Sequence, residues 1–312
     1  VGIGIGAADI RWEPTHQWNV GIDFEVWKNR FRGTVDVYNK QTRELIWEEP
    51  IPVYTGATFV NQNSDLTVTN RGVEVSLALD VIRNTDMKLT LRGNMSYNEN
   101  FVSNMDEPLI DGNYITRNGG QTFEFFTIPY AGVNPENGNL LFLTQDNQLT
   151  ETPQEGDRRL THKSRVPVYQ GGFGFDFDYK GFFVTTNFTF AQKVWRFDFD
   201  LEGLYDSTPA GLGQFVVSSD LLNAWTPDNT DTDVPSLDAS NLGEAANSDR
   251  FLRNASYVRM RYAQIGYRVP AKFLEKTFMS NLTFFVQGEN LYTWTAWQGF
   301  DAESNRFADQ GQ

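Results

Sequence analysis

Long stretches of the chain alternate apolar and polar residues with a period of two. From Trp18 to Val26 every even position is apolar, whereas the odd positions from Gln17 to Glu25 are polar or glycine. A helix would not keep this parity for so long, because its apolar positions recur every three or four residues. The pattern therefore predicts a β-strand, here His16–Val26, with one apolar and one polar face.

The same alternation predicts seven further strands. Tight turns near Lys28–Asn29, Arg83–Thr85 and Lys180–Gly181, and a longer connection at Pro270–Ser280, join these strands in pairs. The parity slips near Arg261, which indicates a β-bulge. After the first, the predicted strands cover roughly Phe31–Trp47, Gly72–Val81, Met87–Tyr97, Val168–Tyr179, Phe182–Trp195, Ala255–Val269 and Leu282–Trp294.

The length of these strands favours a membrane protein. They run about 10 to 17 residues, whereas strands of soluble proteins usually run about 5 to 6. A tilted strand needs about 9 to 11 residues to cross the hydrocarbon of a bilayer.

The connections alternate between short and long. Long segments separate the strand pairs at Glu48–Asn70, Asn100–Pro167 and Arg196–Asn254, and another follows Trp294. An up-and-down barrel with short periplasmic turns and long extracellular loops has this rhythm, whereas a soluble sandwich has no reason to collect its long loops at one end. Loops of this length are generally functional or disordered.

Composition agrees with a membrane barrel. Aromatic residues make up 14% of the chain, with 25 Phe, 12 Tyr and 8 Trp, yet the mean hydropathy is only -0.45. A barrel combines both properties, since lipid-facing apolar residues alternate with polar residues facing the lumen. No apolar run reaches the roughly 18 residues of a transmembrane helix.

Charge and cysteine content narrow the classes of function. The net charge is -14, which makes nucleic acid an unexpected partner. The chain has no cysteine, so disulfides, thiol catalysis and cysteine metal sites are excluded. It begins at Val1 without methionine or a signal pattern, and we expect it to be processed or a fragment.

Eight short segments are distinctive in sequence and are spread over nearly the whole chain. The first four are DIRWEPTHQWNVGIDF at Asp9–Phe24, NRGVEVSL at Asn70–Leu77, YAGVNPENG at Tyr130–Gly138 and YKGF at Tyr179–Phe182. The last four are NASYVRMR at Asn254–Arg261, IGYRVP at Ile265–Pro270, QGENLYTWT at Gln287–Thr295 and GFDAE at Gly299–Glu303. In this order, these segments resemble the signatures of the SusC/RagA family of TonB-dependent outer-membrane transporters.

The resemblance implies an all-β fold: a transmembrane antiparallel up-and-down β-barrel with long extracellular loops. Family barrels have about 22 strands, so residues 1–312 would supply about eight of them, from the C-terminal part of the barrel. The plug domain and the last strand of the family are expected to be absent from this chain.

The resemblance also implies a function. A family member imports nutrients, most often oligosaccharides or peptides, across the cell outer membrane, and it takes energy from the TonB complex through its plug. It works with a SusD-like lipoprotein that caps the barrel. The barrel itself is surrounded by outer-membrane lipid. We expect no enzyme activity, no catalytic residue, no metal and no cofactor.

Two other functions remain open from the sequence. A passive porin or structural outer-membrane barrel would share the strand pattern but would lack a plug and a TonB-contact segment. A soluble carbohydrate-active or adhesive β-protein would be recovered without detergent.

Some residues are candidates for contact with cargo or partners. Polar parity predicts that Arg92, Asp176, Asp178, Glu289 and Asn290 face the lumen. Trp225 lies in a long loop and is a candidate for ligand or partner contact, although it could equally belong to a loop core. The other tryptophans fall mostly at predicted strand ends: Trp12, Trp18, Trp27, Trp47, Trp195, Trp294 and Trp297. For those on apolar parity, an interfacial aromatic girdle is a better interpretation than a sugar-stacking platform.

Three other features are better explained without special chemistry. His16 and His162, the only histidines, have no partners at metal-ligand or relay spacing. The acidic run Asp228–Asp233 lacks EF-hand spacing and is expected to be a solvated loop rather than a calcium site. The glycines of Gly2–Gly6 lack phosphate-loop spacing and predict a strand end.

Overall fold

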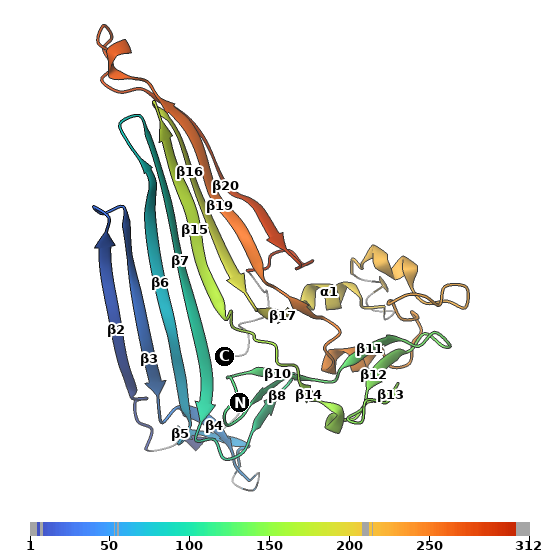
Figure 1. The fold of residues 1–312 in the computed structure, drawn as a ribbon. Helices are drawn as coiled ribbons and strands as arrows, with labels where there is room; N and C mark the ends of the chain where they lie inside the picture. The colour runs from blue at the N-terminus through green and yellow to red at the C-terminus, as the bar shows by residue number, and fades with distance from the viewer. Residues whose placement is uncertain are drawn as a thin grey trace.

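Eight long antiparallel strands form one curved sheet, and shorter elements gather at one end of it (Figure 1). The computed structural model describes residues 5–6, 9–52, 54, 56–207, 212–213 and 215–303. Each strand of the sheet pairs with the next in chain order, which confirms the up-and-down topology. The strands are β2 (Thr15–Val26), β3 (Phe31–Thr42), β6 (Thr67–Arg83), β7 (Met87–Ser103), β15 (Tyr169–Tyr179), β16 (Phe182–Gln192), β19 (Tyr257–Arg268) and β20 (Thr283–Thr295).

The strand predicted over Phe31–Trp47 is too long. Strand β3 ends at Thr42, and Glu44 has φ = 51°, a left-handed conformation that breaks an extended strand. The backbone N–H of Ile46 then donates to Oε1 of Glu13 at 2.8 Å, and β4 (Ile46–Pro50) joins a different sheet with β5 (Phe59–Asn63) and β1 (Ile5–Gly6). Of the glycine-rich N-terminal stretch, only Ile5–Gly6 is described, as this short strand.

The strand predicted over Gly72–Val81 is too short. Strand β6 extends to Thr67 at one end and Arg83 at the other, where these residues pair with Ser103 and Lys88 of β7. Polar residues at the end of β6 interrupt the alternation of apolar and polar positions, so the sequence pattern predicts a shorter strand. Backbone pairing between strands does not depend on that alternation.

The four short connections of the sheet all lie at one end, at the top of Figure 1, and the long segments lie at the other. In the first turn Trp27, Lys28 and Asn29 have φ values of 55°, 57° and 64°. The Lys180–Gly181 turn also uses positive φ, which asparagine and glycine tolerate best.

A bulge at Arg261 shifts the register of the last three strands. The pairing of β16 with β19 shifts between Asn187 and Phe188, and the pairing of β19 with β20 shifts between Met260 and Tyr262. Arg261 is therefore an extra residue relative to β16, which confirms the predicted parity slip.

The described residues of two long segments, 104–168 and 193–256, fold together into what we call the loop body. The β-bridge between Ile128 and Ser248 joins the two segments to each other. The pairing of β17 with β18 joins the two ends of the second segment. Its elements are β8 (Leu109–Asp111), β9 (Tyr114–Thr116), β10 (Glu124–Thr127), β11 (Tyr130–Val133), β12 (Leu140–Leu143), β13 (Leu149–Thr150), η2 (Glu155–Asp157), β14 (Arg159–Leu160), β17 (Trp195–Phe197), α1 (Phe199–Leu204), η3 (Ser219–Asn223), η4 (Leu242–Asn247) and β18 (Leu252–Asn254).

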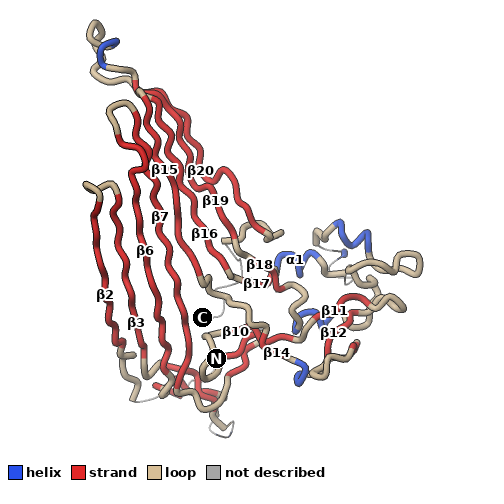
Figure 2. The backbone as a smooth tube through the Cα atoms, in the orientation of Figure 1, coloured by secondary structure: helices blue, strands red, loops and turns tan. Residues whose placement is uncertain are grey.

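Helices are short and confined to connections (Figure 2). The 3-10 helix η5 (Ala271–Phe273) lies in the connection between β19 and β20, and α1, η2, η3 and η4 lie in the loop body. Within the described ranges, no helix has both the length and the apolar character needed to cross a membrane.

The dry hydrophobic core lies in the loop body. The main cluster contains Phe125, Ile128, Leu140, Phe142, Phe197, Ala245, Phe251 and Leu252. A second cluster around Val194 and Trp297 joins the loop body to the end of the sheet, and a third surrounds Val234.

Candidate functional site

The sheet has an apolar face and a polar face that run unbroken across all its strands. Residues directly opposite each other on antiparallel strands project to the same face. One continuous row on the apolar face is Ile22, Val35, Val75, Met95, Gly171, Phe190, Val258 and Trp294. The neighbouring row on the polar face is Gly21, Asp36, Glu74, Ser96, Gln170, Ala191, Tyr257 and Thr295.

Large side chains on the apolar face are exposed. The exposed fractions are 64% for Val20, 66% for Ile22, 60% for Ile265 and 73% for Val286. An apolar surface that extends over eight strands would be unfavourable in water. Hydrocarbon is the solvent that such a face fits.

Aromatic residues border this face at both ends. Strand β15 carries Tyr169 and Tyr179 at its ends and has 11 residues. At about 3.3 Å per residue and a tilt of about 40°, a strand of this length spans about 25 Å, the height of the apolar band of outer-membrane barrels. The border at the loop end includes Trp18, Tyr97, Tyr169 and Trp294, and the border at the short turns includes Trp27, Tyr179, Phe182, Tyr267 and Phe284.

The girdle interpretation is wrong for Trp297. Its side chain is only 9% exposed and packs in a cluster with Ala191, Val194 and Ala255. Because Ala191 projects to the polar face, Trp297 lies on the side of the sheet away from the girdle. Parity could not place it, since it follows the last strand.

Three of the residues predicted to face the lumen form ion pairs on the polar face. Arg92 pairs with Asp176 and also donates from Nη2 to the backbone oxygen of Thr186 at 2.9 Å. Asp178 pairs with Arg268, two strands away. These two carboxylates are thus neutralised by cations from other strands of the sheet.

Glu289 and Asn290 reach the polar face together although they are adjacent in sequence. Glu289 lies opposite Tyr262, and the Asn290 side chain accepts a hydrogen bond from Arg261 at 3.0 Å. Asn290 has φ = 50°, so it forms part of the bulge opposite Arg261. In a regular strand, neighbouring side chains would point to opposite faces.

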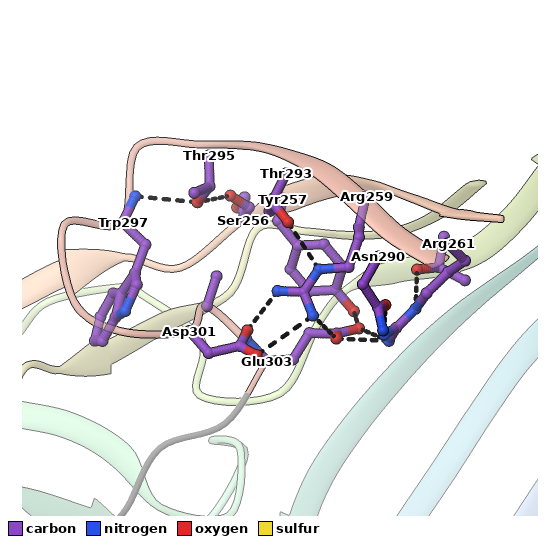
Figure 3. A network of polar contacts seen from close by, with 12 residues as sticks. Ser256, Tyr257, Arg259, Arg261, Asn290, Thr293, Thr295, Trp297, Asp301 and Glu303 are labelled. Carbon is purple, nitrogen blue, oxygen red and sulfur yellow. Dashed lines mark hydrogen bonds and ion pairs between the residues drawn. The ribbon is translucent and has the colours of Figure 1, made fainter. Parts of the chain in front are cut away.

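A polar network closes the loop end of the polar face (Figure 3). Glu303 pairs with Arg261 and accepts from Arg259 Nη1 at 2.7 Å and from the hydroxyl of Tyr257. Arg259 also reaches Asp301, with 2.5 Å between Nη2 and Oδ1. This hydrogen bond holds the pKa of the Asp301 carboxyl below its ordinary value.

The network binds the segment after β20, residues 296–303, back against the sheet. The Thr295 hydroxyl donates to the backbone oxygen of Ser256 at 2.8 Å, and the backbone N–H of Trp297 donates to Thr295 Oγ1 at 3.0 Å. The sequence did not predict that these residues form a unit. The polar parity of Arg259 and Arg261 and the Gly299–Glu303 signature were the available signals.

Below this segment the polar face is hollowed. The hollow has a volume of about 520 Å³ and crosses strands β3, β6, β7, β15, β16 and β19. Its lining includes Asp36, Glu74, Ser96, Gln170, Arg261 and Glu303. The mixture of hydroxyl, amide and charged groups suits hydrated polar molecules.

Trp225 links the two segments of the loop body. Its Nε1–H donates to the backbone oxygen of Pro135 at 3.1 Å. Its ring packs so closely on Gly138 that a Cβ there would lie 2.6 Å from the ring, and Gly138 also needs its φ of 77°. This geometry supports the loop-core interpretation, and contact with a ligand or partner stays a prediction.

The histidines and the acidic run Asp228–Asp233 form no metal site among the described residues. Asn229 and Thr232, within the acidic run, bond to the backbone oxygen of Asn223, which folds the run into a turn. In the part of the chain that the structure describes, no group of three or more His, Asp or Glu side chains could hold a metal ion. His16 and His162 are both exposed.

Curated relatives of the chain are TonB-dependent receptors, although no family profile matches it. TonB-dependent receptor P3 of Formosa agariphila is 28% identical over 97% of this chain and 32% of its own length. TonB-dependent receptor SusC of Bacteroides thetaiotaomicron is 25% identical over 95% of this chain and 30% of its own length. The chain thus spans about a third of these relatives.

The fold matches a solved transporter. The structure of the RagAB peptide transporter superposes with a TM-score of 0.80 and 25% identity over 94% of this chain and 33% of that chain. The RagAB peptide importer in its open-open state gives a TM-score of 0.81 over 95% and 33%. Together with the two-faced sheet, these similarities show that the chain forms an antiparallel sheet of an outer-membrane β-barrel and resembles SusC/RagA-type TonB-dependent receptors, which are transporters and not enzymes.

Proposed function

We propose that the chain supplies about a third of the barrel wall of a nutrient importer that carries oligosaccharides or peptides across the outer membrane. The energy comes from TonB through a plug domain of the intact receptor. A SusD-like lipoprotein caps the barrel at the loop end. The observation that carries the proposal is the similarity to SusC and to RagAB along nearly the whole chain.

In this proposal the two faces of the sheet divide the work. The apolar face contacts lipid, and the polar face, with Arg92, Asp176, Asp178, Glu289 and Asn290, lines the lumen. Because Arg92, Asp176 and Asp178 lie in ion pairs, this part of the lining keeps cargo hydrated without holding it tightly. Recognition then falls to the loops, the plug and the lipoprotein.

The loop body suits a docking role because it is folded before any partner arrives. It has its own dry core around Phe125 and Phe142 rather than open, structureless loops. A preorganised surface avoids the entropy cost of ordering a loop on binding. This favours a stable cap over a transient one.

Uptake measurements test the proposal. Cells that make the intact receptor are given fluorescent oligosaccharide and peptide mixtures, with matched cells that lack TonB, the neighbouring lipoprotein or the receptor. We expect one class of cargo to accumulate only when receptor and TonB are both present. Uptake that persists without TonB would instead show a passive porin, and the class that accumulates names the cargo.

A further inference from the structure

A pocket opens on the apolar side of the molecule, where the sheet meets the loop body. It has a volume of about 410 Å³, and its lining includes Glu99, Phe101, His162, Lys163, Lys193 and Trp195. The network and hollow of the polar face share none of these residues. It therefore needs an explanation of its own.

The pocket faces outward from the barrel wall. Tyr97 and Tyr169 pair on the apolar face, and the Lys193 ammonium lies 5.2 Å from the centre of the Tyr169 ring. Val194, the next residue, turns to the opposite side and packs on Trp297. Lys193 thus projects from the loop-end aromatic border into the surroundings of the barrel.

The pocket carries an excess of available positive charge. Its acidic residues are already paired, Glu99 with Arg71 at 2.7 Å and Glu124 with Arg117 at 2.9 Å. Lys193 is exposed and, among the described residues, meets no carboxylate within ion-pair distance. The Lys163 ammonium lies 4.3 Å from the centre of the Trp195 ring and forms a long ion pair with Asp249, with 3.9 Å between Nζ and Oδ2.

The position of the pocket defines which molecule can fill it. Short turns of outer-membrane barrels are periplasmic, so the loop end of this sheet lies at the outer leaflet. Below the pocket the wall is apolar and exposed, with Val73, Met95 and Phe173 at 36%, 43% and 45%. A ligand must therefore place apolar chains on the wall and an anionic group among the lysines.

We propose that this basic pocket binds the phosphorylated headgroup of an outer-leaflet lipid. Lys163 and Lys193 contact the phosphate as charge-assisted donors, and the rings of Tyr169 and Trp195 hold their side chains in place. Basic pockets next to an apolar membrane face bind anionic headgroups by the same chemistry. The proposal rests on membrane placement and not on transport, so it can stand or fail independently of the proposed function.

The fold offers a matched control at the other end of the same hairpin. The Lys180 ammonium lies 5.5 Å from the centre of the Tyr179 ring, a distance similar to the 5.2 Å between Lys193 and Tyr169, and both lysines have positive φ. Lys272 lies 5.0 Å from the ring of Phe273 at that end. Substituting Lys180 and Lys272 removes two similar cations from the periplasmic border.

The test titrates the purified intact receptor with fluorescent diphosphorylated lipid A and with its dephosphorylated form. We expect Lys163→Gln with Lys193→Gln to weaken binding of the phosphorylated lipid at least tenfold, and Lys180→Gln with Lys272→Gln to change it less than twofold. The dephosphorylated lipid should bind the unaltered receptor with a low affinity. That affinity should equal the affinity of the Lys163→Gln, Lys193→Gln variant for the phosphorylated lipid.

Three outcomes overturn the proposal. Equal binding of the two lipids to the unaltered receptor would show that phosphate is not recognised, and this result needs no variant to fold. Equal losses in both double variants would show nonspecific attraction to cations. Full competition by millimolar inorganic phosphate would show a soluble-anion site rather than a lipid site.

Discussion

The sheet and the loop body solve opposite problems with the same residue types. In the loop body, Phe125 and Phe142 are 1% and 0% exposed and pack into a dry core. On the sheet, Val286 and Ile22 of the edge strands β20 and β2 are 73% and 66% exposed, and Met95 and Phe173 of the inner strands β7 and β15 are still 43% and 45% exposed.

The difference shows that each region is matched to its own solvent. The loop body gains stability by removing apolar surface from water, as a soluble domain does. The sheet gains nothing from burying its apolar face, because hydrocarbon solvates it, and depends on backbone pairing between neighbours. Within the described ranges, the three hydrophobic clusters lie in the loop body or where it joins the sheet.

The largest expected effect breaks the loop body while leaving the sheet intact. Phe142→Ala should destabilise the loop body by about 3 to 5 kcal/mol, because it opens a cavity in a dry core. Hydrogen exchange of the intact receptor should accelerate over residues 104–168 and 193–256 and stay slow in the strands. The control Phe173→Ala, on the lipid side, should leave exchange in the loop body unchanged; the opposite ranking of the two variants would refute the comparison.

A second prediction sharpens the difference between the faces of one strand. Ile22→Arg should cost about 2 to 4 kcal/mol near the middle of the bilayer, since it places a charge in hydrocarbon. Asp23→Arg, its neighbour on the polar face, should have little effect. Guanidinium unfolding midpoints in lipid vesicles measure both, and equal shifts would reject the assignment of the faces.

A third prediction concerns the segment that links the two regions. Glu303→Gln should loosen residues 296–303 by about 1.5 to 3 kcal/mol, since charge-assisted hydrogen bonds to Arg259 and Arg261 are lost. Glu99→Gln removes an exposed ion pair with Arg71 and should cost about 0 to 1 kcal/mol. Limited proteolysis within residues 296–303 distinguishes them, and comparable cleavage in both variants would contradict the network's role.

The smallest expected effect is a pH dependence. The hydrogen bond from Arg259 lowers the pKa of Asp301, so its contribution to stability is complete above the ordinary carboxyl pKa of about 3.9. It is lost as the pH falls through the lowered value. Hydrogen exchange of residues 296–303, corrected for intrinsic rates, should rise below about pH 4, and Asp301→Asn should remove this response; a variant that still responds would assign it to another group.

The polar residues of the candidate site were predicted in part. Alternation placed Arg92, Asp176 and Asp178 on one face, but their partners come from other strands: Asp176 for Arg92 and Arg268 for Asp178. The network of Glu303 and the basic pocket of Lys163 and Lys193 were not predicted. Their members lie far apart in sequence, and no local pattern relates them.

The sequence by itself determined the eight strands, their two faces, the alternating loops and the bulge at Arg261, because strand periodicity is a local property of the chain. Only the tertiary structure decided that residues 104–168 and 193–256 form one loop body, that Trp297 turns inward, and that β3 stops at Thr42. These outcomes depend on contacts between segments more than a hundred residues apart, such as Asn113 with Ala246, which are 133 residues apart. Packing between such segments leaves no periodic trace in either one.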